Sequence, residues 1–151
     1  MKGEPLVILL VEDNPAHAEL IMRILEEHKV ANRIYHVSNG EAALDYLFRH
    51  GKYGDEELSP RPHLVLLDLR LPRIDGLEVL KEIKTSPETR LIPVVILTTS
   101  EADRDMTRAY DSHANSYLVK PVEFDAFTKL LNDLGFYWLA WNKHPYVQFG
   151  E

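Results

Sequence analysis

Acidic, hydroxyl and amine side chains stand where four apolar runs of this 151-residue chain end. They are Glu12 and Asp13 after residues 6–11, Asp68 after residues 63–67, Thr98 after residues 93–97, and Lys120 after residues 116–119. A carboxylate directly after a buried strand, such as Asp68, is costly unless it is paired or takes part in chemistry. In an open parallel sheet, ligands bind beyond the carboxyl ends of the strands, so these residues predict a single polar site.

The three acidic residues of this set suggest a metal ion. If the strands that precede Glu12 and Asp68 are neighbours, the carboxylates converge, and close carboxylates cannot all ionise cheaply without a cation. Oxygen donors in a site with few protein ligands suit Mg²⁺, which completes its shell with water and phosphate oxygens. Glu12 and Asp13 are adjacent and cannot both point at one atom, so we expect one to bind directly and the other through water.

The same set of residues fits phosphoryl transfer. This reaction needs a nucleophile, in-line positioning and charge compensation for the phosphoryl oxygens. Asp68 is the best candidate for the nucleophile, because it stands directly at the end of the third, central-looking strand, and it would become an aspartyl phosphate. Lys120 would supply a positive charge and Thr98 a hydroxyl donor.

Short Leu-rich and β-branched runs alternate along the chain with stretches of helical period. This alternation indicates βαβ units, and therefore an α/β fold with a parallel sheet covered on both faces. The predicted strands cover roughly 6–11, 33–37, 63–68, 93–98 and 115–119. The predicted helices begin at Asn14-Pro15, at Ser38 or Asn39, after Asp75-Gly76, at Ser100, and after Lys120-Pro121. Ser100 and Asp103 loosely resemble a capping box, and Phe124 and Phe127 belong to the apolar face of the last helix. Residues 51–62 look too polar for the core and predict a surface loop.

The bulk composition limits the class of protein. One domain is expected at this length, and the formal net charge of −7 would repel nucleic acid on average. The absence of Cys fits a reducing compartment. The sequence shows no signal peptide and no apolar run near the ~20 residues of a membrane span. We therefore expect a soluble cytoplasmic protein that contacts neither nucleic acid nor membrane.

Four motifs together resemble the receiver domain of bacterial two-component response regulators, over about residues 6–134. They are Glu12-Asp13-Asn14, Asp68-Leu69-Arg70-Leu71-Pro72 with Gly76, Leu97-Thr98-Thr99-Ser100, and Tyr117-Leu118-Val119-Lys120-Pro121. The resemblance implies a flavodoxin-like (βα)5 doubly wound parallel sheet with strand order 2-1-3-4-5. It also implies a signalling protein that catalyses its own phosphorylation and dephosphorylation, rather than an enzyme for outside substrates. We expect the receiver domain at residues 1–135 and an aromatic C-terminal extension at residues 136–151.

The resemblance also implies a role for each matching position. The roles are metal binding for Glu12 (assisting) and Asp13 (direct), phosphoacceptor and metal ligand for Asp68, a metal-binding backbone carbonyl for Arg70, phosphoryl contact for Thr98 and Lys120, and switching for Thr98 and Tyr117. In this family the variable positions held by Arg70 and Ser100 influence the phosphoryl lifetime. Glu12 stands where many receivers have Asp, which bears on metal affinity. The Lys120-Pro121 peptide bond is expected to be cis.

The loop at residues 51–62 and the end of the chain resemble the single-domain regulators partnered with bacterial phytochrome kinases. The matching tail is Phe136-Tyr137-Trp138-Leu139 with His144-Pro145. This second resemblance implies a phosphohistidine donor on a light-sensing histidine kinase, and a homodimer formed through the face from the fourth strand to the fifth helix. Two placements of the tail stay open, on its own domain or in an interface, and the downstream protein is unknown.

Three other functions are compatible with a sheet of this kind. A phosphatase with an aspartyl-phosphate intermediate usually needs a second acid two residues after the nucleophile, where this chain has Arg70. A nucleotide-binding module needs a Gly-rich loop after the first strand, where this chain has Glu12-Asp13-Asn14. A phosphorylation-independent adaptor stays open. None of the seven histidines has metal-ligand spacing or stands at a strand end with the acids.

Overall fold

Five parallel strands form one sheet at the centre of the chain. The structure is a computed structural model that describes residues 6–28 and 32–141. The strands are β1 (Leu6–Val11), β2 (Asn32–Val37), β3 (Leu64–Leu67), β4 (Val94–Thr98) and β5 (Ser116–Val119). Their order in the sheet is β2-β1-β3-β4-β5, and every neighbouring pair is parallel. The predicted flavodoxin-like order is therefore confirmed.

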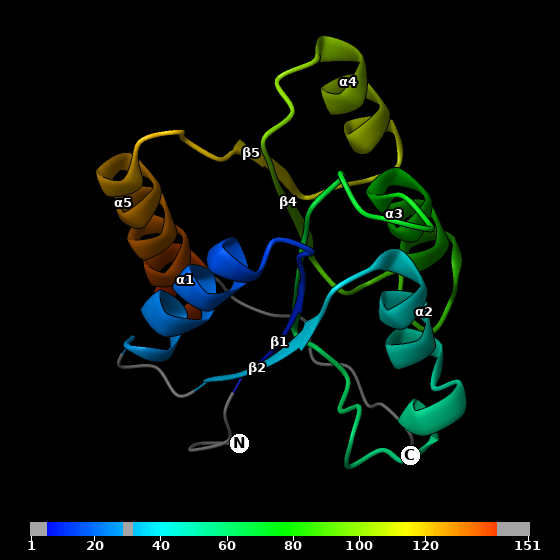
Figure 1. Cartoon of the computed structure of the whole chain (residues 1–151). Coiled ribbons are helices and arrows are strands. Elements are labelled where there is room, and N and C mark those ends of the chain that lie inside the picture. Colours follow the sequence, from blue (N-terminus) through cyan, green and yellow to red (C-terminus); the bar gives the residue numbers. More distant parts are fainter. Residues whose placement is uncertain (1–5, 29–31, 142–151) are drawn as a thin grey trace.

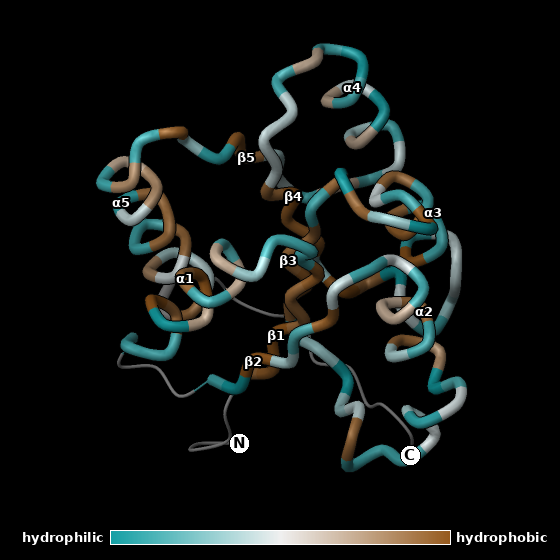
Figure 2. The backbone as a smooth tube through the Cα atoms, viewed as in Figure 1, coloured by the Kyte–Doolittle hydropathy of each residue, from teal (hydrophilic) through white to brown (hydrophobic). Residues whose placement is uncertain are grey.

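Five α-helices cover the two faces of this sheet (Figure 1). They are α1 (Pro15–Glu26), α2 (Gly40–Phe48), α3 (Gly76–Thr85), α4 (Asp103–Asp111) and α5 (Phe124–Gly135). Helices α1 and α5 pack together on one face, whereas α2, α3 and α4 cover the other. The strands lie between the two layers and are the most hydrophobic part of the chain (Figure 2). No helix in the described part of the chain combines the length and the apolar character that a bilayer span requires.

Each strand contributes side chains to two separate apolar clusters, one on each face of the sheet. In β1, Leu9 and Val11 join the cluster under α2 and α3, whereas Ile8 and Leu10 join the cluster under α1 and α5. Strands buried on both faces need apolar residues at every position rather than at every second one. This explains why β1, β3 and β4 appear in the sequence as continuous apolar runs, whereas β2, at the edge of the sheet, contains Asn32, Arg33 and His36.

The first three helices begin at the predicted residues. Side-chain oxygens of Asn14, Asn39 and Asp75 accept hydrogen bonds from backbone N–H groups of the first turns, and each residue is an N-cap. The capping box predicted for α4 is wrong. Its N-cap is Ala102, without a side-chain cap, because the hydroxyl group of Ser100 donates instead to a carboxylate oxygen of Asp105 at 2.6 Å.

The segment between α2 and β3 runs over the surface, as predicted, but it is anchored at its end. It begins with a short 3-10 helix, η1 (Gly51–Gly54). The buried hydroxyl group of Ser59 donates to the carbonyl groups of Tyr53 and Asp55. The hydroxyl group of Tyr46, on α2, donates to the carbonyl oxygen of Pro60 at 2.6 Å. These bonds hold the end of the loop against the helix that precedes it.

The aromatic extension continues α5 without a break, as the π-helical segment η2 (Phe136–Trp141). Trp138 and Leu139 are buried in the cluster under α1 and α5, so this part of the extension packs on its own domain. Phe136 and Tyr137 are exposed. The His144-Pro145 motif lies outside the described residues, and an interface role for the extension stays a prediction.

Candidate functional site

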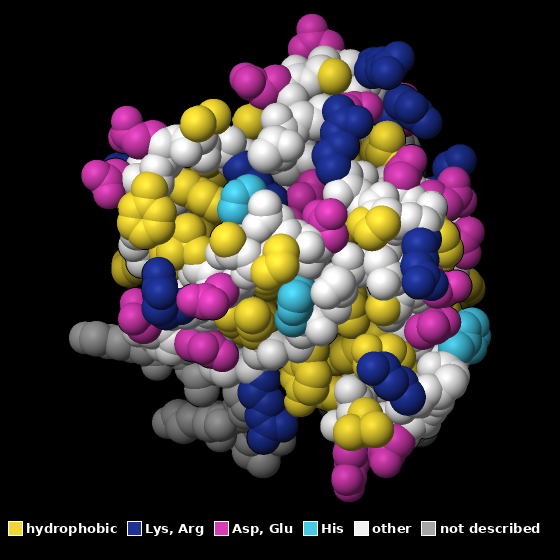
Figure 3. Space-filling view, viewed as in Figure 1, with side chains coloured by type: hydrophobic (Ala, Val, Ile, Leu, Met, Phe, Trp, Pro, Cys, Tyr) yellow, Lys and Arg dark blue, Asp and Glu magenta, His cyan; other side chains and the backbone are white. Residues whose placement is uncertain are grey.

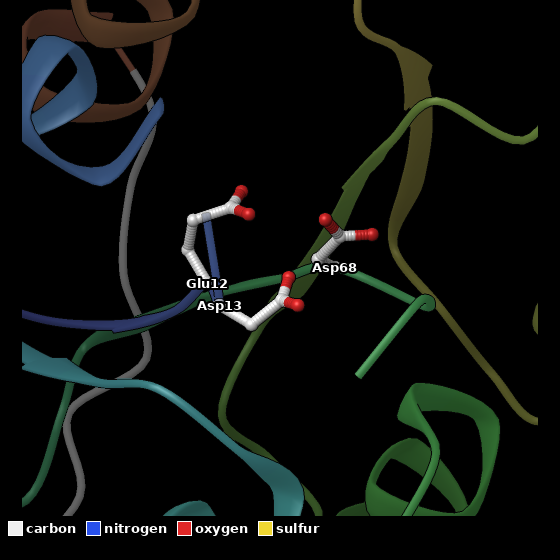
Figure 4. A group of neighbouring side chains, drawn as sticks. All are labelled: Glu12, Asp13 and Asp68. Atoms are coloured by element: carbon white, nitrogen blue, oxygen red, sulfur yellow. The ribbon is translucent and has the colours of Figure 1, made fainter. Parts of the chain in front are cut away.

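Three carboxylates converge beyond the carboxyl ends of β1 and β3 (Figure 4). These two strands are paired in the sheet, so Glu12 and Asp13 lie beside Asp68. One carboxylate oxygen from each residue lies within 4.8 Å of the other two. Glu12 and Asp68 are buried, whereas Asp13 is exposed. The predicted acidic cluster is therefore present.

Lys120 places a buried ammonium group between two of these acids. Its Nζ lies 2.5 Å from Oε1 of Glu12 and 3.0 Å from Oδ2 of Asp68, and only 2% of its side chain is exposed. Burial raises the pKa of Glu12, and the charge and hydrogen bond of Lys120 oppose this shift. Buried charges are tolerated only when they are paired in this way.

The formal charge of the cluster matches a divalent cation. Three carboxylates and one ammonium group leave a formal charge of −2 when all are ionised. The donors are oxygen atoms only, and Asp13 opens the cluster to solvent, so a metal ion could enter and keep several waters. The residues fit a hard divalent cation held by Glu12, Asp13 and Asp68.

Local backbone geometry fixes the position of Asp68. The backbone N–H of Arg70 donates to Oδ1 of Asp68 at 3.0 Å. Gly76, the first residue of α3, approaches so closely that a Cβ atom there would overlap with the carbonyl oxygen of Asp68. Only glycine permits this approach, which brings the start of α3 against the end of β3.

The two residues predicted to act as a switch lie on the neighbouring strands β4 and β5. Thr98 is fully buried at the end of β4, whereas the next residue, Thr99, is exposed, so the register places Thr98 in the site. The hydroxyl group of Tyr117 donates to the carbonyl oxygen of Ser100 at 3.0 Å. Burial raises the pKa of Tyr117. Both residues therefore contact the loop between β4 and α4.

The peptide bond in the loop after β5 does not have the predicted cis form. The peptide bond between Lys120 and Pro121 is trans, as are the other peptide bonds of the described residues. The predicted cis bond is therefore wrong, and trans is the form that an X–Pro bond favours by roughly 0.5–1 kcal/mol.

His17 belongs to the site, although no histidine was expected there. It lies on the first turn of α1, where its Nδ1 accepts from Nζ of Lys120 at 3.1 Å and its ring meets that of Phe127 edge-on at 5.4 Å. Burial, and next the charge of Lys120, lower the pKa of His17, and Asp68 and Asp13 oppose the shift. Its position four residues after Asp13, one turn into the helix, is the signal that could have revealed it.

A groove of about 490 Å³ opens beside Lys120, between α1 and the loop from β5 to α5. Ala16, Leu20 and Phe127 give it an apolar floor. Val122 and Phe124 stand exposed at its edge, so the prediction that Phe124 belongs to the packed face of α5 is wrong. Figure 3 shows hydrophobic side chains gathered over α1 and α5 on this side of the molecule.

Comparison with known proteins agrees with the fold. Probable methanogenesis regulatory protein FilR2 of Methanothrix harundinacea is 51% identical over 142 residues, which cover 94% of this chain and 89% of that protein. Response regulator Rcp1 of Synechocystis is 42% identical over 135 residues, 89% of this chain and 90% of that protein.

Solved structures of two such regulators superpose closely. The Mn²⁺-bound form of Rcp1 gives a TM-score of 0.90 at 40% identity, over 94% of this chain and all (100%) of that chain. The phosphorylated cyanobacterial phytochrome response regulator RcpA also gives 0.90, at 37% identity, over 95% and 100% of the two chains. The family model of the response regulator receiver domain matches residues 8–132. The chain therefore belongs to the response regulator receiver domain family.

Proposed function

We propose that this chain is a single-domain response regulator that accepts a phosphoryl group on Asp68 from a phosphohistidine of a sensor histidine kinase. The observation that carries the proposal is the cluster of Glu12, Asp13, Asp68 and Lys120, with its formal charge of −2. We assign Mg²⁺ as the cation, bound by the three acids and the backbone carbonyl of Arg70. The oxygen-only donor set and the open, solvent-facing side of the cluster support this choice.

Each step of the proposed transfer is assigned to a residue of the site. One carboxylate oxygen of Asp68 attacks phosphorus, and the bond from phosphorus to the histidine nitrogen breaks, leaving its electron pair on the imidazole. Lys120, already 3.0 Å from Asp68, shifts its ammonium group to a phosphoryl oxygen, and Thr98 donates its hydroxyl hydrogen to another. A cation held by the acids would supply further charge compensation. Water then hydrolyses the acyl phosphate in the same site and resets the protein.

The phosphoryl group would act as a switch by changing populations. It favours the conformation in which Thr98 and Tyr117 turn towards the site, because it binds that conformation more tightly. Tyr117 now donates to the carbonyl group of Ser100, so its movement would rearrange the surface formed by α4, β5 and α5. We assign this surface to a homodimer and to a downstream protein, with residues 136–151 as a docking or dimer contact beside the receiver domain at 1–135.

The groove beside Lys120 suits the kinase. Along α1 it is lined by apolar Ala16 and Leu20 beside polar His17, Glu19 and Arg23, and it reaches Lys120 of the site. A helix carrying the phosphohistidine could lie in it with the reactive nitrogen near Asp68. The name of RcpA, a cyanobacterial phytochrome response regulator, supports a phytochrome-like kinase, which would act in the cytoplasm where it draws on ATP. FilR2, at 51% identity, supports a second candidate input, a kinase of methanogenesis regulation.

Phosphorylation by acetyl phosphate tests the proposal. The protein is incubated with acetyl phosphate and Mg²⁺, and its intact mass is measured with and without EDTA. Asp68→Asn removes the nucleophile, and Asp103→Asn, at an exposed position on α4, is the matched control. We expect a metal-dependent adduct on wild type and on the control, and none on Asp68→Asn.

Two other results would contradict the proposal. An adduct on Asp68→Asn would place the nucleophile elsewhere. No adduct on wild type, under conditions that label another receiver, would favour the phosphorylation-independent adaptor. A turnover assay on phosphate monoesters excludes the phosphatase if no product forms. Transfer from an autophosphorylated phytochrome kinase then distinguishes the two candidate inputs.

A further inference from the structure

The side chain of Arg70 connects the site to α4. Its backbone N–H donates to Asp68, as described above, whereas its guanidinium group points to the loop after β4. There Nη2 lies 3.3 Å from Oγ of Ser100 and 3.3 Å from Oδ2 of Asp105, which is the third residue of α4. The hydroxyl group of Ser100 donates to the same oxygen of Asp105 at 2.6 Å. One residue thus contacts both the phosphoacceptor and a helix that carries no other part of the site.

Few groups hold α4 in place. Asp105 and Ala109 are its buried residues, and the N-cap provides no side-chain hydrogen bond. The helix stands out at the edge of the helical layer and is largely hydrophilic (Figures 1 and 2). A helix without a wide apolar face gains little from packing. The contacts of Asp105 with Arg70 and Ser100 are therefore a major part of what fixes its first turn.

We propose that the ion pair of Arg70 and Asp105 is a latch that the phosphoryl group on Asp68 opens. The guanidinium group would leave Asp105 for the phosphoryl oxygens, because guanidinium binds phosphate in a bidentate, charge-assisted way. The side chain of Arg70 is 64% exposed, so it can move without unpacking the core. Asp105 is then a positioning residue that acts through Arg70. This inference rests on the phosphoryl transfer proposed above.

Opening the latch would release α4. Asp105 is buried, and a buried carboxylate that loses its cationic partner is destabilised. The first turn of α4 would therefore move towards water. Ser100 would move with it, and its carbonyl group holds the hydroxyl group of Tyr117. The latch would thus couple the phosphoryl group to the predicted aromatic switch by a chain of contacts.

Two effects of Asp105→Asn follow. The first is a loosened α4 in the unphosphorylated protein, because the charged partner of Arg70 is gone. The second is tighter binding of a phosphoryl analogue, because coupling between two sites is reciprocal and the analogue no longer competes with Asp105 for Arg70. The affinity for beryllofluoride with Mg²⁺ should rise about two- to fivefold, the range that partly exposed ion pairs allow.

The experiment uses the full chain and a double-mutant cycle. Beryllofluoride affinity is measured by calorimetry in the presence of Mg²⁺ for wild type, Asp105→Asn, Arg70→Ala and the double variant. Hydrogen exchange of the amides in α4 is followed by mass spectrometry with and without the analogue. Asp103→Asn is the control, because it makes the same charge change in the same helical turn at an exposed position.

We expect Asp105→Asn to bind the analogue more tightly only when Arg70 is present, and to exchange faster along α4 than Asp103→Asn. In wild type the analogue should speed this exchange, and in Asp105→Asn it should add little. An equal effect of Asp105→Asn in the Arg70→Ala background would reduce Asp105 to a structural role and overturn the latch. Unchanged affinity would do the same. No binding by wild type would overturn the phosphoryl site itself, so the two failures are distinguishable.

Discussion

Replacing Lys120 by Met should destabilise the metal-free protein strongly. Met keeps most of the side-chain volume but removes the charge that lies 2.5 Å from Glu12 and 3.0 Å from Asp68. Removing one partner of a buried ion pair costs about 3–5 kcal/mol, because it leaves an uncompensated buried charge. Two carboxylates lose their partner here, although protonation of one of them limits the loss. We expect a decrease of about 3 kcal/mol in the free energy of unfolding at pH 7.5 in EDTA.

The pH dependence of this loss follows from Glu12. Burial already raises its pKa in the folded protein, and the contacts with Lys120 lower it. Without Lys120 the pKa rises further above its unfolded value. A raised pKa means that the folded state binds the proton more tightly, so the contribution to stability is present at low pH and is lost as the pH rises through the folded pKa. The cost of Lys120→Met should therefore shrink as the pH is lowered towards that value.

Mg²⁺ should recover much of the loss, because it supplies positive charge to the same carboxylates. A ligand at one hundred times its dissociation constant stabilises the folded state by about 2.7 kcal/mol. Urea unfolding in EDTA and in Mg²⁺ measures both effects. Lys129→Met is the matched control, since its ion pair with Asp133 is exposed and should cost no more than about 0.5 kcal/mol. A loss below about 1 kcal/mol in EDTA, or equal gains from Mg²⁺ in the two variants, would refute the reasoning.

Three further perturbations test other parts of the structure. Gly76→Ala should cost at least about 1 kcal/mol in urea unfolding, because the added Cβ meets backbone that cannot give way. Tyr46→Phe should cost about 1 kcal/mol in the same assay, because the partly buried carbonyl group of Pro60 loses its donor. In NMR titrations of the metal-free protein, His17 should titrate below its usual 6.5, and Lys120→Met should raise its pKa. Because this pKa is depressed, the contribution of His17 to the free energy of unfolding is present at pH values above 6.5 and is lost as the pH falls through the folded pKa. A titration midpoint at the usual value would contradict this.

The sheet and the acidic cluster could be predicted because both depend on local patterns. Continuous apolar runs identify buried parallel strands, and polar residues directly after such runs meet at one edge of the sheet. The strand order, the switch role of Tyr117 and the backbone role of Arg70 came from the family resemblance rather than from these patterns.

Contacts between side chains distant in sequence could not be predicted in this way. Asp105 resembles any acid in the first turn of a helix until the fold brings Arg70 beside it, 35 positions away. His17 is separated from Lys120 by 103 positions, and its place one helical turn after Asp13 is the single hint of this contact in the sequence. The capping box predicted for α4 was wrong for the same reason. The hydroxyl group of Ser100 donates to Asp105 and does not cap the backbone of the first turn. Such contacts depend on the exact packing of loops.

The loop anchored by Tyr46 enters the sheet at the end opposite to the site. It leads into the start of β3, whereas Asp68 follows the end of that strand. Figure 1 shows the loop and the β4–α4 connection at opposite ends of the molecule. The parallel sheet thus separates the loop that shapes one end of the surface from the residues that carry the chemistry at the other end. Insertions and deletions at residues 51–62 can alter the outline of the protein, and with it the choice of neighbours, while the chemistry at the other end is inherited unchanged.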